Sequence, residues 1–447
     1  MSELYTIPKT PRIIKRAKAS RRRMSLTKIF LSAWVTFLFL WPAMIFAKGE
    51  KLPRGWKQCD KYVFVQAADW QTEYVEEAYK RFGSSQGKKL GVGIACMFYV
   101  FERDMNTFVN SLQTWLSECE KYGVPLLIEL DPITFWDNVP ELWNWFDPNL
   151  PGYSDANREN VEWTSWDKKD AVKIGWFNWG RVARLKPMAN LFAPRYQAAV
   201  LDRYKILLNI IYKWYKKLPK KKKYLLCGIK FTGELAVGQN NWYYPNGNSY
   251  YEKWPNDSSH DPNYSHDFSK DPSYGFVQIG YASLSYSGIK KEGTITAEDI
   301  VAMETKYLDF VADIVDDYFP RQMIFGQSGT LNAHLGTSVN SRCCPSWSLY
   351  GAGARNLEAE PKIIDYLDKS DAPYWGAAEW ALTFQIKNKE PKEVYYSSIK
   401  NILGEKRCRF LSIFQEVLGN YVNAKGKPYL PAIQAIQQLQ EEYEKVY

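Results

Sequence analysis

The sequence is poor in the residues from which structural metal sites are built. It contains only three His (His260, His266 and His334), and its seven Cys show no Cys-x-x-Cys spacing. Structural zinc sites use thiolates and imidazoles at short spacings, so no such site is indicated and we expect no metal or other cofactor. The odd number of Cys also leaves at least one thiol outside any internal disulfide.

Motifs of two common enzyme classes are missing as well. No Gly-x-Gly-x-x-Gly follows the first apolar run, which argues against a dinucleotide-binding fold. No Gly-x-Ser-x-Gly elbow follows a predicted strand, so Ser-His-Asp chemistry lacks support. With 46% hydrophobic and 24% charged residues, the chain is not disordered, collagen-like or coiled-coil, and its 447 residues can bury the core of one large barrel.

Positive charge is scarce outside the N-terminus. Residues 1–50 hold ten Lys or Arg against two Glu, which leaves only +1 of the total charge of +9 for the other 397 residues. A domain that neutralises phosphates needs a basic face, so we expect no nucleic-acid partner for the folded part.

An uncharged apolar run at 29–47 follows the basic segment and ends in small residues, which is typical of a secretory signal. At about 1.5 Å per residue it could also span a bilayer as an uncleaved anchor. We predict a basic extension with a signal peptide or signal anchor at 1–47, with cleavage near Ala47 favoured. We expect the remainder, a single catalytic barrel at 48–447, to be exported, either secreted or periplasmic, with any membrane attachment through 29–47.

The rest of the chain alternates short apolar runs with segments of helical period, which predicts a parallel sheet. The eight predicted strands are 62–68, 90–99, 124–131, 224–234, 323–328, 345–350, 372–380 and 409–415. The predicted helices are 70–82, 105–119, 195–218, 297–319, 359–368, 391–403 and 431–443, with none clear between 328 and 345. This pattern favours an α/β fold of the (β/α)₈ TIM barrel type over a six-stranded doubly wound sheet.

The predicted loops after strands three and four, at 132–194 and 235–275, are far longer than usual, and long loops in compact domains are commonly functional. They hold nine of the 18 Trp, interleaved with Asn, Asp, Gly and Tyr. Flat aromatic faces beside hydrogen-bonding groups suit pyranose rings. We also expect about half of these Trp only to pack the loops onto the barrel.

Two carboxylates stand at the ends of predicted strands. Glu234 ends the fourth strand and Glu379 the seventh, so both should emerge at the mouth of the barrel. An ionised carboxylate at the end of a buried strand is costly unless it is paired or used. Glycoside hydrolysis requires two such groups, one to protonate the leaving oxygen and one at the anomeric carbon. A purely structural role, as salt-bridged strand ends, is the alternative.

The glutamates of strands four and seven, with the aromatic-rich mouth, resemble clan A of the glycoside hydrolases, which includes the family 42 β-galactosidases. The resemblance implies a (β/α)₈ retaining enzyme in which Glu234 is the acid/base and Glu379 the nucleophile. One position differs, because the clan usually has Asn directly before its acid/base and this chain has Gly233. The contact with the sugar 2-hydroxyl would then come from another residue, such as Asn240 or Asn241.

We predict that further polar and aromatic residues near strand ends bind a carbohydrate substrate. These candidates are Trp136, Trp176, Asn178, Trp179, Asn240, Asn241, Trp242, Gln327, His334, Tyr350 and Trp380, and weaker ones are Glu129, Asp131 and Glu416. The sequence thus predicts a retaining glycoside hydrolase for β-linked oligo- or polysaccharides. An inverting enzyme on the same fold and a non-catalytic carbohydrate-binding barrel remain as alternatives.

Overall fold

The computed structural model describes residues 52–136, 138–173, 175–178, 182–235, 239–243, 275–328, 342–382, 390–414, 417–418 and 428–446. For 175–178, 182–185, 234, 239–243, 275–277, 328 and 446 it describes the backbone alone. The predicted leader at 29–47 lies outside these ranges. Among the described helices, none is both long and apolar enough to cross a membrane.

Eight parallel strands close into a barrel in which each strand pairs with the next along the chain and the last pairs with the first. These strands are β1 (Lys61–Ala68), β2 (Leu90–Tyr99), β3 (Leu126–Asp131), β6 (Leu226–Leu235), β9 (Ile324–Ser328), β10 (Cys344–Tyr350), β11 (Trp375–Ala381) and β12 (Cys408–Ile413). The predicted TIM barrel is confirmed, and the predicted strands agree with these to within three residues at each end.

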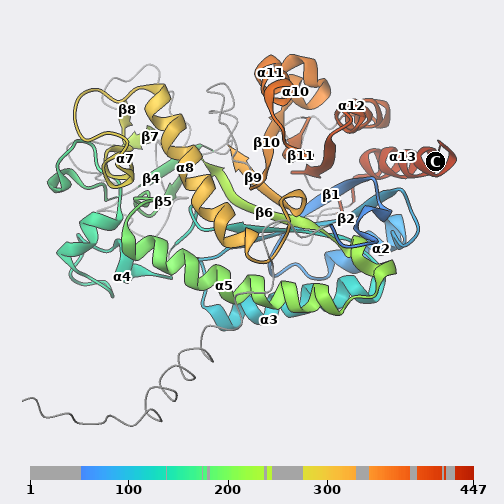
Figure 1. Cartoon of the computed structure of the whole chain (residues 1–447), viewed down its shortest axis with the longest axis horizontal. Coiled ribbons are helices and arrows are strands. Elements are labelled where there is room, and N and C mark those ends of the chain that lie inside the picture. Colours follow the sequence, from blue (N-terminus) through green and yellow to red (C-terminus); the bar gives the residue numbers. More distant parts are fainter. Residues whose placement is uncertain are drawn as a thin grey trace, which may run out of the picture. The chain divides into compact units, whose positions relative to one another are not determined.

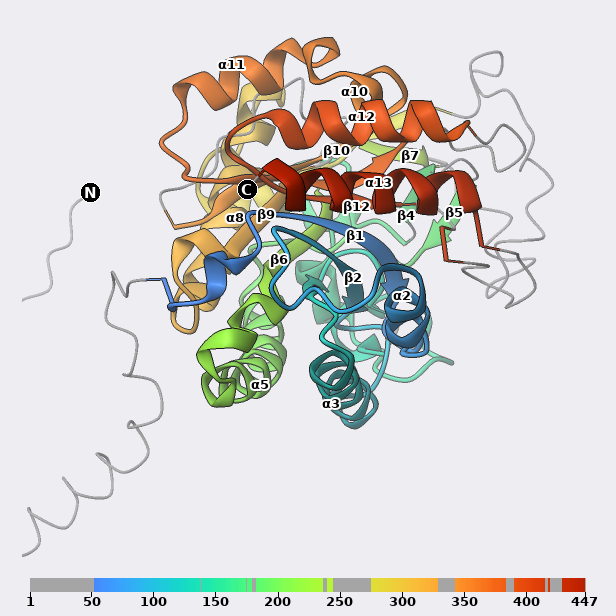
Figure 2. The same cartoon turned by 90° about the vertical axis from the view of Figure 1, so that its right-hand side faces the viewer.

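Helices cover the outside of the barrel, with α3 and α5 on one side and α12 and α13 on the other (Figures 1 and 2). The longer ones are α2 (Tyr74–Phe82), α3 (Met105–Tyr122), α5 (Pro194–Lys217), α8 (Ala297–Asp316), α11 (Pro361–Lys369), α12 (Lys392–Gly404) and α13 (Leu430–Val446). Shorter ones are α4 (Pro140–Trp143), α7 (Tyr281–Ser287) and α10 (Gly351–Arg355). The segment 329–341, where the sequence predicts no clear helix, lies outside the described residues.

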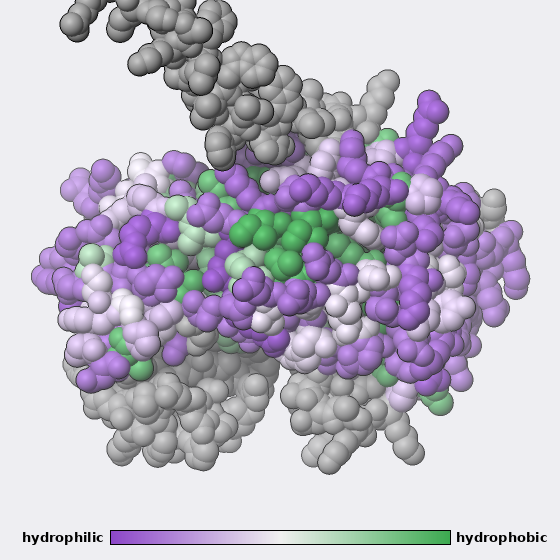
Figure 3. Space-filling model, turned by 90° about the horizontal axis from the view of Figure 1, so that it is seen from below, coloured by the Kyte–Doolittle hydropathy of each residue, from purple (hydrophilic) through white to green (hydrophobic). Residues whose placement is uncertain are grey.

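Helix α3 forms as its sequence predicts. The Asp104 carboxylate accepts a hydrogen bond from the Thr107 amide at 3.0 Å and caps the N-terminus. Gly123, with φ of 69°, ends the helix in the left-handed conformation that favours glycine. The face on which α3 and α5 lie also exposes a patch of hydrophobic side chains among hydrophilic ones (Figure 3). On α5, Ile206 is 44% exposed.

The N-terminal end of the barrel is closed by an arginine. Arg409 on β12 is buried, and its Nη1 donates to the carbonyl oxygens of Cys59 and Asp60, both at 2.8 Å. Its guanidinium also lies 3.8 Å from the centre of the Trp56 ring and donates to the Trp56 carbonyl. These hydrogen bonds and the contact with the aromatic ring offset the cost of removing the guanidinium from water. A charged side chain can therefore fill this end of the core.

All seven cysteines are free and buried. Burial raises the pKa of Cys59, Cys227, Cys344 and Cys408 to about 12. A buried neutral thiol is a poor nucleophile and a poor metal ligand. These residues therefore act as small hydrophobic side chains.

The two long insertions form small antiparallel sheets of their own. The loop after β3 contains β4 (Gly175–Asn178), which pairs with β5 (Val182–Leu185). The loop after β6 contains β7 (Gln239–Tyr243), which pairs with β8 (Gly275–Gln278). Strand β4 contacts β7, so the insertions that follow barrel strands three and four meet each other.

Candidate active site

The two glutamates predicted as catalytic stand at the same end of the barrel. Glu234 is the second-last residue of β6, the fourth barrel strand, and Glu379 lies near the end of β11, the seventh. Parallel strands place their carboxyl ends at one mouth. Strands β9 and β10 lie between β6 and β11 in the barrel, so the two glutamates are on strands that do not pair with each other. The side chain of Glu234 lies outside the described part of the chain.

Both glutamates follow an irregularity in their strand. On β6, Leu235 comes four positions after Phe231, whereas their partners on β9, Gly326 and Ser328, are only two positions apart. Thr232 has a φ of 63°. A β-branched residue is rarely found there, so the backbone is strained two residues before Glu234. On β11, Ala378 is an extra residue, because Trp347 and Ser348 of β10 pair with Ala377 and Glu379. Bulges re-aim the side chains that follow them and recur near active sites.

The backbone carbonyl of Ala378, in the second bulge, accepts a hydrogen bond from a side chain of β1, which is separated from β11 only by β12. Gln66 of β1 donates through Nε2 to the oxygen of Ala378 at 3.1 Å. Without this bond a buried peptide oxygen would lack a donor, which costs about 1 to 3 kcal/mol. Gln66 therefore stabilises the bulge immediately before Glu379.

The glycine at position 233, directly before Glu234, has a steric explanation. A Cβ added to it would lie 3.0 Å from Asp131 Cγ, closer still to Asp131 Oδ2, and 3.1 Å from Thr134 Oγ1. Asp131 is fixed there, since its carboxylate accepts from the amides of Ile133 at 2.7 Å and Thr134 at 3.1 Å, and from the Thr134 hydroxyl. A larger residue directly before Glu234 would collide with this carboxylate. Burial raises the pKa of Asp131, and these hydrogen bonds counteract that rise.

Glu379 is partly exposed, and donors hold both of its oxygens. The Tyr350 hydroxyl, at the end of β10, donates to Oε2. The Gln327 amide, on β9, donates to Oε1 at 3.2 Å and to Ser348 Oγ at 3.1 Å. Two of the residues predicted to bind substrate, Gln327 and Tyr350, therefore lie against the predicted nucleophile. Two donors on a carboxylate fix its orientation.

A buried ion pair lies behind Gln327. Lys230 of β6 and Glu129 of β3 are each 1% exposed, and Lys230 Nζ lies 2.9 Å from Glu129 Oε2. The same Nζ donates to Gln327 Oε1 at 2.5 Å. Burial raises the pKa of Glu129 to about 7, while the Lys230 ammonium opposes this rise and the Glu379 carboxylate adds to it. Sequence analysis missed Lys230, although a lysine inside the apolar run of 225–231 is a signal in itself.

Two tryptophans predicted to bind substrate are core residues. Trp136 is 1% exposed, its indole nitrogen donates to the Pro187 carbonyl at 2.9 Å, and its ring packs edge-on against Tyr196. Trp380 is fully buried and donates to the Ala354 carbonyl. Trp380 follows Glu379 on a strand, so its side chain points to the opposite face, toward the helices. The expectation that these rings offer a face to a sugar is corrected accordingly.

Five of the other predicted binding residues lie on the two small sheets. Trp176 and Asn178 are on β4, and Asn240, Asn241 and Trp242 are on β7, with only their backbones described. Trp179, His334 and Glu416 lie outside the described residues. Because β4 contacts β7, the structure brings these two groups of positions together.

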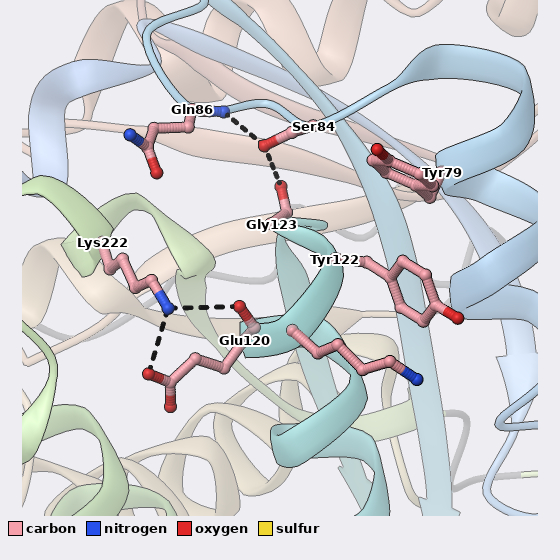
Figure 4. Close-up of a pocket in the computed structure, with 8 residues that line it drawn as sticks. Tyr79, Ser84, Gln86, Glu120, Tyr122, Gly123 and Lys222 are labelled. Carbon is pink, nitrogen blue, oxygen red and sulfur yellow. Dashed lines mark hydrogen bonds and ion pairs between the residues drawn. The ribbon is translucent and has the colours of Figure 1, made fainter.

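A separate pocket of about 350 Å³ lies at the other end of the barrel, where helices lead into strands (Figure 4). Its lining includes Tyr79, Tyr122 and the ion pair between Lys222 and Glu120 at 3.2 Å. In a TIM barrel this end supports stability rather than chemistry. Among the described residues, no group of His, Cys, Asp and Glu is arranged to hold a metal ion.

Comparison with known proteins gives structural matches only. No family model and no curated protein matches the chain. A family 5 xyloglucanase from Bacteroides ovatus, in complex with a heptasaccharide, shares 9% identity, with 90% of this chain and 80% of that chain covered and a TM-score of 0.43. A β-galactosidase from Bacillus circulans sp. alkalophilus shares 10% identity, with 86% and 56% covered and a TM-score of 0.43.

The endoglucanase Cel5A from Thermotoga maritima shares 10% identity, with 86% of this chain and 98% of that chain covered and a TM-score of 0.40. These three proteins are glycoside hydrolases. The predicted resemblance to family 42 in particular is not confirmed. At TM-scores below 0.5 the similarity carries no information on substrate or mechanism. The barrel itself rests on the strand order of this chain.

Proposed function

We propose that the chain is a retaining glycoside hydrolase that cleaves β-linked oligo- or polysaccharides with Glu379 as nucleophile and Glu234 as acid/base. The observation that carries the proposal is the setting of Glu379. It is a partly exposed carboxylate at the mouth of the barrel, directly after a bulge, with donors from Tyr350 and Gln327 on its two oxygens. A nucleophilic carboxylate needs this combination of access and fixed orientation.

The reaction follows in two displacements. In the first, a Glu379 oxygen bonds to the anomeric carbon while the glycosidic bond breaks and the Glu234 carboxyl gives its proton to the leaving oxygen. In the second, Glu234 removes a proton from water, the water oxygen bonds to the anomeric carbon, and the ester to Glu379 breaks. The anomeric configuration is inverted twice and hence retained, and the protein returns to its starting state.

The carbohydrate class is proposed from the insertions. Strands β4 and β7, which contact each other, carry aromatic and amide residues in their sequence, and both insertions follow the strand ends that form the mouth. Such residues suit the faces and hydroxyls of pyranoses. We also propose that the chain is exported, on the strength of the basic and apolar segments at 1–47.

The test is a screen of the purified chain against 4-nitrophenyl glycosides and plant, mucin and algal glycans, followed by two variants. Glu379→Ala should lower kcat by at least about 10⁴-fold because the covalent route is lost, and azide should restore a glycosyl azide of inverted configuration. The matched control is Glu118→Ala, a surface carboxylate of α3 paired with Lys121, which should leave kcat unchanged. Activity of Glu379→Ala near that of the wild type would refute the nucleophile.

Glu234→Ala should spare substrates with good leaving groups, which need little protonation in the first step. The glycosyl intermediate should then accumulate, because its hydrolysis lacks a base, and mass spectrometry should find the sugar on the peptide that contains Glu379. Equal losses on activated and unactivated substrates, with no intermediate detected, would show that Glu234 is not the acid/base and would make Glu129 the next residue to test.

A further inference from the structure

A lysine inside the barrel connects the predicted nucleophile to a third carboxyl group. Lys230 Nζ lies 2.9 Å from Glu129 Oε2 and donates to Gln327 Oε1 at 2.5 Å. Gln327 Nε2 in turn donates to Glu379 Oε1 at 3.2 Å. The contacts join β3, β6, β9 and β11, and only Glu379 among these four side chains is more than slightly exposed.

The order of donors and acceptors in this chain fixes which way the Gln327 amide faces. An amide has one accepting oxygen and one donating nitrogen, and an ammonium can only donate. Lys230 therefore takes the oxygen, which turns the nitrogen of Gln327 toward Glu379 and Ser348 Oγ. A flipped amide would set its NH₂ against the ammonium and its oxygen against the carboxylate, and both contacts would be repulsive.

We propose that Lys230 is a positioning residue for the reaction: by holding the Gln327 amide in one orientation, it fixes the carboxylate of Glu379 for attack. This role rests on the proposed function, since it acts through Glu379. Glu129 is the buried carboxyl partner of Lys230, with its Oε2 2.9 Å from the same Nζ.

The contacts of Glu379 show what the loss of Lys230 would change. The Tyr350 hydroxyl from β10 donates to one oxygen of Glu379, and the Gln327 amide from β9 donates to the other. Lys230 donates to the oxygen of the same amide, so its removal frees the Gln327 side chain to turn. The Glu379 carboxylate then loses the fixed donor at Oε1.

The experiment compares Lys230→Met with Glu129→Gln and with a control, Lys61→Met, in the full chain. Lys61 is the first residue of β1, at the end of the barrel opposite to Glu379, and its Nζ donates to the carbonyls of Glu405 at 2.8 Å and Cys408 at 2.7 Å. Rates are measured against substrate concentration on the 4-nitrophenyl β-glycoside that the wild type cleaves best, and circular dichroism checks that each variant folds.

Lys230→Met should lower kcat about 10- to 100-fold with KM within about threefold, the loss typical of a misplaced reacting group. Glu129→Gln retains the donation from Lys230 to Gln327, so it should lose less kcat than Lys230→Met does. Lys61→Met should keep the wild-type kcat and KM even if its stability falls.

A double variant, Glu129→Met with Lys230→Met, separates positioning from folding. Replacing a buried ion pair by apolar residues of similar volume is often neutral for stability. The double variant should therefore fold and still show the kcat loss of Lys230→Met within about threefold. Wild-type kcat in the double variant, or a Lys230→Met kcat equal to that of Lys61→Met, would overturn the positioning role alone. A wild type that cleaves none of the glycosides or glycans would refute the proposed function, and this role with it.

Discussion

Gly233 offers a test of the local geometry beside Glu234 that does not depend on activity. An added Cβ would lie 3.0 Å from Asp131 Cγ, where ordinary contacts begin near 3.4 Å. Relieving this overlap means moving the Asp131 carboxylate, which overpacks the site and loosens its hydrogen bonds to Ile133 and Thr134. We expect Gly233→Ala to cost about 2 to 4 kcal/mol of unfolding free energy.

The cost should depend on Asp131. In an Asp131→Ala background the main obstacle is absent, and the Thr134 hydroxyl, 3.1 Å from the added Cβ, is no longer held by the Asp131 carboxylate and can rotate away. The φ of Gly233 lies outside the left-handed region. Gly→Ala then acts only on the entropy of the unfolded chain, so it should be neutral or stabilise the protein by about 0.4 to 1 kcal/mol. The coupling between the two sites should thus be about 2 to 5 kcal/mol.

Urea unfolding followed by tryptophan fluorescence measures all four proteins of this cycle. Gly404→Ala, at the end of α12 where an added Cβ meets nothing within 4 Å, serves as the control and should not destabilise the chain. Equal costs of Gly233→Ala with and without the Asp131 carboxylate would refute the steric explanation.

Further predictions concern the nucleophile, the core and the thiols. Tyr350→Phe removes a donor to Glu379 and should lower kcat about 10-fold with little change in KM; unchanged kcat would contradict the contact. Arg409→Met should cost at least about 3 kcal/mol in urea unfolding, because three carbonyls lose a donor, whereas Lys369→Met, in an exposed pair, should cost under about 1 kcal/mol. Burial raises the pKa of Glu129 from 4.5 to about 7, so its contribution to stability is fully present below pH 4.5 and lost as the pH rises through 7; Glu129→Gln should flatten the decline of stability between these values. A thiol reagent should label all seven cysteines in denaturant and none quickly in the native protein, and rapid native labelling would contradict their burial.

The sequence by itself determined the barrel and the places of the two glutamates. Buried parallel strands are continuous apolar runs, so β2 could be delimited without error, and Gly123 marks the end of α3 because few other residues adopt its conformation. Once strands four and seven were counted, the rule that parallel strands end at one mouth put Glu234 and Glu379 there.

Only the tertiary structure decided what surrounds these carboxylates. The bulges at Thr232 and Ala378 depend on register between strands, which one strand's residue pattern does not encode. Trp136 and Trp380 looked like sugar platforms because an aromatic residue near a strand end is compatible with a mouth and with a core. The side of the strand decides this for Trp380, and the packing of the loop after β3 decides it for Trp136. The contacts from Glu129 through Lys230 and Gln327 to Glu379 join residues of four strands up to 250 positions apart. These contacts exist because closure of the barrel brings the side chains together in one small interior. The low polarity there makes a charged group stable only when it has partners.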